Sequence, residues 1–324
     1  MSMVQRLPIP FWLTYLLIAT VESFLVHSAA WWDGTTPALT LQPIFLLFPL
    51  RTWISLALIT FLNQQAIQAL RHFRPLLDSD DEERRLAEQM TKMPARPVLL
   101  VNLLGVLYFL FLALYSPLEA FKDRPLLTPV YLVSGFLAFG VGSVIYYHTF
   151  RQLHFVHRIY AGVRSFNLFR MEPVYAFSRL TALTSGAYLL LVSLTLLLFP
   201  YPVTDMRAVL SFLLQILLSL FAFVVPLWNT HQRLATEKRR LESAVDLRIE
   251  TMLEHMHRHI DELKVQNLAE DKTALESLLL ERKLLEGLPT WPWEMNTLKS
   301  ILTAIFVPLL LFLAQLVLER WLAQ

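Results

Sequence analysis

Seven runs of nearly uncharged apolar residues constrain the fold of this chain more than any other feature. A helix needs about 20 residues to cross a hydrocarbon core of about 30 Å, and each run has about that length. None alternates apolar and polar residues, which excludes barrel strands. We therefore predict an all-α, polytopic membrane protein with seven transmembrane helices. The runs are Phe11–Ala29, Gln42–Phe61, Val98–Tyr115, Pro129–Tyr147, Leu180–Phe199, Val209–Trp228 and Leu298–Leu318.

The distribution of lysine and arginine predicts the orientation of these spans. The segment before the first span and every second connection after it hold 22 basic residues, whereas the opposite segments hold 4. Basic residues stay on the cytoplasmic side of a membrane. We therefore expect the N-terminus inside, the C-terminus outside, and a location in the cell (inner) membrane. A cleaved signal peptide that ends near Ala29 is the alternative interpretation of the first run.

Composition excludes several classes of function. The chain has no cysteine among its 324 residues, so it cannot form disulfides or thiolate metal sites, and its net charge of +2 is too small to indicate a nucleic-acid partner. It contains no phosphate-binding glycine loop, no nucleophile elbow and no paired catalytic carboxylates. We expect a protein that is not an enzyme, binds no cofactor and has the lipid bilayer as its main partner.

The segment between the sixth and seventh spans has the pattern of a helical hairpin. Residues 229–287 of this segment contain no proline, and apolar residues recur at steps of four and three from Leu241 to Leu263 before the pattern breaks near Asn267. Both ends of the segment must reach the same membrane face, so we predict two antiparallel helices. The predicted organisation is a six-helix bundle (1–228) with cytosolic loops 71–96 and 151–178, a cytosolic hairpin (229–287), and a joint with the last span (288–324).

Two short motifs predict how helices begin and end outside the membrane. In the acidic run after Leu77, Ser79 is expected to cap a short helix, with Glu82 reaching back to it. After Gly287, two prolines prevent the returning helix from continuing. Two tryptophans beside them are typical of the headgroup region, so we interpret this joint as an interfacial anchor. The joint residues are Pro289, Trp291, Pro292 and Trp293.

Polar residues inside the first two spans point to buried interactions. Glu22 and Arg51 both fall near the middle of the bilayer at a rise of 1.5 Å per residue, so we predict an ion pair between the two spans. The pair is interpreted as a structural staple or as a gate or ion site. A carboxamide cluster in the inner half of span two is too polar to face lipid: Asn63, Gln64, Gln65 and Gln68.

The last span has a narrow stripe of polar and small residues at helical spacing. Such a stripe faces the core of a bundle or lines an aqueous path, and both interpretations stay open. The candidate pore-lining residues are Thr297, Ser300, Ala304, Pro308, Leu311 and Gln315. On the hairpin, His255, His259 and Glu262 share one helix face at a spacing able to hold a metal. Because the helix is rich in charge and lacks the HExxH pattern, we expect a solvated face and no metal there.

The predicted layout resembles that of insect olfactory and gustatory receptor channels. Both combine seven spans, an internal N-terminus and an external C-terminus with a cytosolic helical block before the last span. The resemblance implies a tetramer in which cytosolic helices form the anchor and the seventh span lines the pore. The Thr-Tyr and Gln-Phe signature of that family's last span has no counterpart here. The stretches FNLFRMEPVYAFSRLT and LPTWPW are also similar to pieces of uncharacterised bacterial membrane proteins.

These features favour a homo-oligomeric, channel-like membrane protein with an ion path beside the seventh helix, assembled through its cytosolic helices. One alternative is a signalling or scaffold protein whose hairpin binds a partner. The other is a small-solute transporter with a site near Glu22, Arg51 and the carboxamide cluster.

Overall fold

The computed structural model describes residues 9–77, 79–115, 124–163, 166–198, 206–261 and 268–322, and every regular element within these ranges is a helix. Seven stretches of these helices are long and apolar enough to cross a membrane. This confirms the all-α prediction and the number of membrane-spanning candidates. The elements are α1 (Phe11–Trp32), α2 (Pro43–Phe73), η2 (Arg74–Leu76), α3 (Asp80–Thr91), α4 (Ala95–Tyr115), α5 (Leu127–Gly162), α6 (Glu172–Leu198), α7 (Met206–Asp261), α8 (Leu268–Glu286) and α9 (Met295–Leu322).

Two of the long helices continue well beyond their apolar runs. Span six and the polar sequence after it form α7, which is a single helix of 56 residues. Span four continues as α5 to Gly162, so α5 extends into the predicted cytosolic loop 151–178. Both continuations lack a helix-breaking residue in their polar parts, so their backbone hydrogen-bond ladders run on without interruption.

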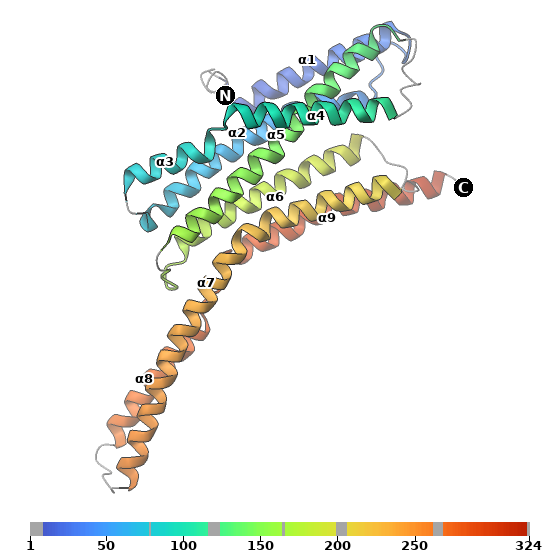
Figure 1. Cartoon of the computed structure of the whole chain (residues 1–324). Coiled ribbons are helices and arrows are strands. Elements are labelled where there is room, and N and C mark those ends of the chain that lie inside the picture. The colour runs from blue at the N-terminus through green and yellow to red at the C-terminus, as the bar shows by residue number, and fades with distance from the viewer. Residues whose placement is uncertain are drawn as a thin grey trace.

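The helices α2, α5 and α6 form the middle of the bundle (Figure 1). The first helix, α1, packs against α2 and α5, whereas α4 packs mainly against α5 and α9 packs mainly against α6. The outer faces of α4 and α9 therefore remain exposed and carry large apolar side chains such as Leu103, Phe111, Phe306 and Leu310. A lipid bilayer is the solvent that such faces require.

The largest core cluster lies where α5 and α7 leave the bundle. Phe73, Tyr160 and Phe177 are buried there, and their ring centroids lie 5.0 to 5.5 Å apart. Arg233 of α7 donates hydrogen bonds to the backbone carbonyls of Tyr160, at 2.5 Å, and of Val163. These bonds fix α7 to the end of α5 at the point where α7 departs from the bundle.

Beyond the bundle, the second half of α7 and the whole of α8 lie side by side and form a long projection (Figure 1). We call residues 229–261 and 268–286 the arm. Val245 of α7 and Leu285 of α8 are buried in the arm. Arg282 of α8 donates a hydrogen bond to Asp246 of α7 at 2.6 Å, and this contact raises the pKa of the Arg282 guanidinium.

Candidate functional site

Glu22 is the hub of a polar contact between three helices. Its two carboxylate oxygens accept hydrogen bonds from Trp53 Nε1 of α2 and Ser134 Oγ of α5, both at 2.5 Å. The carboxylate therefore holds α1 to both α2 and α5.

Arg51 points in a different direction and does not pair with Glu22. It donates to Thr195 Oγ1 of α6 at 3.4 Å, and its guanidinium carbon lies 5.9 Å from the centroid of the Phe139 ring. No ion pair among the described residues joins Glu22 to Arg51 within 4.0 Å, so the predicted direct pairing is not formed. Arg51 and Trp53 are two positions apart on α2, about 200° around the helix axis. The face that brings Trp53 to Glu22 therefore turns Arg51 towards α6.

The predicted carboxamide cluster divides into two groups. Asn63 is buried, and its Oδ1 shares a hydrogen bond with Nε2 of His148 on α5 at 2.9 Å. Gln64 is half-buried, whereas Gln65 and Gln68 line a cavity on another side of α2. Sequence reasoning missed His148, which follows the predicted end of span four. The continuation of α5 buries it against α2.

The cavity beside Gln65 and Gln68 lies between α2, α6 and the beginning of α9. It has a volume of about 240 Å³ and brings together groups from segments that are far apart in the sequence. Carboxylates and basic groups both contribute, so the cavity can contact ions of either sign or a polar solute. Its lining residues are Gln65, Gln68, Ala69, His72, Glu172, Tyr175, Ala176, Arg179, Leu180, Glu294 and Thr297.

The predicted stripe on α9 begins at this cavity, and most of its later residues are packed in the core of the bundle. Thr297 lines the cavity, while Ala304 and Leu311 pack in an apolar cluster with α6 and α7, and Pro308 is buried. Ser300 lies about 60° around the helix from Thr297, is exposed, and donates to the backbone carbonyl of Asn296 at 2.9 Å. The side chain of Gln315 lies outside the described part of the chain. Most of the described stripe therefore faces α6 and α7.

The joint between α8 and α9 is an aromatic stack against α7. The Trp291 ring lies parallel to His231 of α7 at 3.7 Å between centroids and 4.2 Å from Trp293. Trp293 in turn stacks on Phe223 at 5.2 Å. Pro292 is buried and Pro289 is exposed.

The backbone of the joint is also held by α7. Lys238 Nζ donates to the carbonyls of Glu286 at 2.7 Å and Leu288 at 3.1 Å, which satisfies carbonyl groups at the end of α8. His231 Nδ1 shares a hydrogen bond with the carbonyl of Thr290 at 3.0 Å. The joint that leads into α9 is thus fastened to α7 by both rings and backbone contacts.

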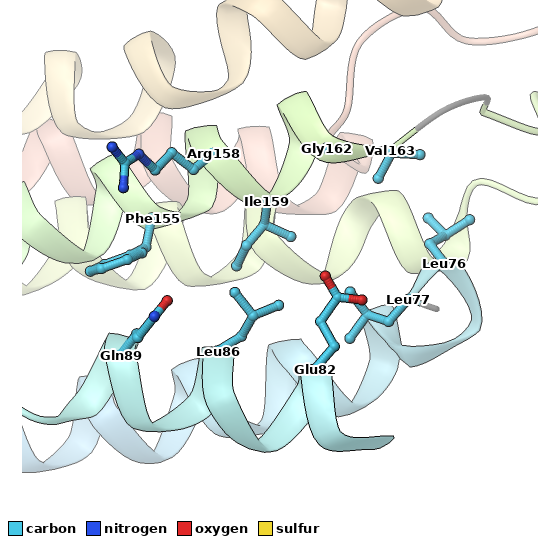
Figure 2. Close-up of a pocket in the computed structure, with 10 residues that line it drawn as sticks. All are labelled: Leu76, Leu77, Glu82, Leu86, Gln89, Phe155, Arg158, Ile159, Gly162 and Val163. Atoms are coloured by element: carbon cyan, nitrogen blue, oxygen red, sulfur yellow. The ribbon is translucent and has the colours of Figure 1, made fainter. Parts of the chain in front are cut away.

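A second cavity of about 300 Å³ lies between α3 and the end of α5 (Figure 2). The predicted capping of α3 by Ser79 is confirmed, since Ser79 Oγ accepts a hydrogen bond from the backbone N–H of Glu82 at 3.2 Å. Figure 2 shows the Glu82 side chain directed from α3 towards α5, with Arg158 on the α5 side of the gap. In the described part of the chain, some buried side-chain nitrogen and oxygen atoms have no hydrogen-bond partner. None of these atoms lies in the lining of this cavity.

At the far end of the arm, two of the three candidate metal ligands come together with a residue that sequence reasoning did not include. His255 and His259 lie close to Asp271 of α8. Glu262 lies outside the described residues. The periodicity of α7 gives no information about which residue of α8 lies opposite, so the sequence alone offered no signal for Asp271.

Comparison of the chain with protein-family models, with curated proteins and with solved structures finds no match.

Proposed function

We propose that this protein is a homo-oligomeric membrane channel whose ion path runs beside α9 and whose subunits assemble through the arm. The observation that carries the proposal is the polar cavity at the start of α9, where Thr297 meets the carboxamides of α2 and the charged groups of α6. Polar and charged groups at one end of a membrane-spanning helix suit the mouth of an ion path. We assign this mouth to the cytoplasmic side.

The apolar packing beyond the cavity suits a closed gate. From Thr297, the face of α9 continues through Ala304 and Leu311, which pack against an apolar cluster that includes Val192 of α6 and Phe212 of α7. A path lined by such residues stays dry while the helices are in contact. Opening would require α9 to move away from α6, and water would then reach the face that is packed here.

The joint supplies a connection between the arm and this gate. Trp291 and Trp293 stack on α7, and α9 begins at Met295, immediately after them. A displacement of α7 at the base of the arm would therefore be passed to the first turn of α9. In this proposal, movement or assembly of the arms sets the position of the gate.

Exposed apolar side chains on the arm support self-assembly. Leu253 and Ile260 of α7 are seven residues apart and 40 % and 51 % exposed, while Leu280 and Leu284 of α8 are four apart and 60 % and 59 % exposed. Both spacings place the members of a pair on one helix face. No lipid would cover them outside the membrane, so they favour contact with a partner, which we identify as another copy of the chain.

Ion flux through liposomes that contain the purified protein tests the channel. We expect flux from the wild type and its loss in Thr297→Trp, because an indole fills much of the cavity. Leu302→Trp is the matched control, since Leu302 lies on the same helix and is 50 % exposed. Absence of flux from the wild type across a range of potentials and ions would contradict the channel. Equal flux from both variants would exclude a path at Thr297.

The oligomeric state tests assembly through the arm. Replacing Leu280 and Leu284 by Glu should disperse an oligomer that the wild type forms in mild detergent. Lys272→Glu changes the charge of α8 by the same amount at a site that is 73 % exposed, and should leave the oligomer intact. A wild-type monomer would favour the second candidate function, a scaffold whose arm binds a different protein. The exposed side chains of Leu280 and Leu284 support that alternative as well, because they could bind a different protein.

A further inference from the structure

The end of the arm brings three metal-binding side chains together from two helices. His255 and His259 are one turn apart on α7, and their ring centroids are 5.0 Å apart. Asp271 lies in the first turn of α8, and its Oδ2 accepts a hydrogen bond from His259 Nδ1 at 2.7 Å. One ligand atom from each of the three side chains lies within 4.8 Å of the others.

The burial of these groups suits a site with one open side. The side chains of His259 and Asp271 are only 16 % and 13 % exposed, so the surrounding helices restrict their positions. His255 is exposed and gives an ion a route of entry. His259 and Asp271 are therefore two ligands that the fold holds in place, and His255 is a third ligand that can move.

The geometry points to a transition-metal site formed by His255, His259 and Asp271, with Zn²⁺ as the best-suited ion. Two imidazole nitrogens and one carboxylate oxygen are ligands that Zn²⁺ prefers, and Mg²⁺ and Ca²⁺ favour sites made of oxygen alone. A fourth position remains for water. The inference concerns the far end of the arm and does not depend on conduction through the bundle.

The change needed to accept the ion is small. Zinc bonds of about 2.0–2.1 Å in a tetrahedral site place the ligand atoms about 3.3 Å apart. The His259–Asp271 hydrogen bond must therefore open by about 0.6 Å. Because no separation exceeds 4.8 Å, the longest one must close by at most about 1.5 Å, which rotation of the exposed His255 side chain can supply. The bound ion would then tie the end of α7 to the beginning of α8.

Metal titration of the full-length protein, purified in detergent without a histidine tag, tests the site. We expect one Zn²⁺ per chain by calorimetry and a tetrahedral Co²⁺ absorption spectrum. His255→Ala, His259→Ala and Asp271→Asn should each weaken binding about tenfold or more. His257→Ala removes an exposed histidine from the same segment of α7 and is the matched control, with no change expected.

Hydrogen exchange gives a second readout that does not rely on affinity. Zn²⁺ should slow exchange in the first turns of α8 in the wild type and have no such effect in Asp271→Asn, whose fold is checked by gel filtration. Absence of a stoichiometric site would overturn the inference. Retention of wild-type affinity by Asp271→Asn would also overturn it, as would an equal loss in His257→Ala, which would indicate adventitious binding to surface histidines.

Discussion

Trp291→Ala should loosen the joint between the arm and α9 without unfolding the bundle. The indole ring lies between two other rings, at 3.7 Å from His231 and 4.2 Å from Trp293, with interplanar angles of 7° and 21°. A stacked aromatic pair contributes about 0.5–1.5 kcal/mol beyond the area that it buries. Loss of these two stacked pairs therefore lowers the free energy of local opening by about 1–3 kcal/mol, and loss of the edge contact with Trp228, at 5.8 Å between centroids, adds to this.

This loss has a measurable consequence in backbone exchange. A change of about 1.4 kcal/mol alters an equilibrium constant tenfold, so amides of the joint should exchange about 5 to 150 times faster in the variant. Hydrogen exchange followed by mass spectrometry measures the peptides of the joint separately from the peptides of the helices α1 to α6. Trp291→Phe retains a ring at the position and should give an intermediate rate.

The control is Trp32→Ala, because the side chain of Trp32 is 82 % exposed and lies at the end of α1. We expect no change at the joint in this variant. Unchanged exchange in Trp291→Ala would refute the argument that stacking holds the joint. A uniform acceleration over all helices would refute its local character.

Two other predictions test the packing of the bundle. A double-mutant cycle of Glu22→Gln and Trp53→Phe should give a coupling free energy of about 1–3 kcal/mol. The cycle of Glu22→Gln and Arg51→Met should give a smaller coupling. An equal or larger coupling with Arg51 would instead support a direct ion pair between Glu22 and Arg51. Gly105→Ala should lower the free energy of unfolding in detergent by about 1–3 kcal/mol, because its Cβ would lie 2.4 Å from a backbone oxygen of α5. Gly142→Ala has open space at the Cβ and should be close to neutral; similar losses in the two glycine variants would contradict the close approach of α4 to α5.

The helices were predictable because their signals are local. Apolar runs fix which segments can span a bilayer, and the absence of proline from residues 229–287 favoured helix in the segment that the second half of α7 and α8 occupy. The Ser79 cap was predictable for the same reason, since the motif and its hydrogen bond lie within four residues. Depth along a helix also follows from counting at 1.5 Å per residue.

The direction of a side chain around its helix was not predictable, because neighbouring helices determine it. We predicted an ion pair between Glu22 and Arg51 only because both lie at the same depth in the bilayer. In the structure, α2 instead turns Trp53 towards Glu22 and Arg51 towards α6. The cavity at Thr297 and the approach of Asp271 to His259 likewise depend on tertiary contacts. No pattern within a single segment of the sequence records those contacts.

Modification of a single introduced cysteine tests most directly whether an ion path runs beside α9. The natural chain has no cysteine, so Thr297→Cys provides a unique target in the proposed mouth. In inside-out vesicles, a membrane-impermeant, charged thiol reagent should block or strongly reduce ion flux through Thr297→Cys. It should leave flux unchanged in Leu302→Cys, on the exposed face of α9. Undiminished flux after complete labelling of Thr297→Cys would contradict the proposed path.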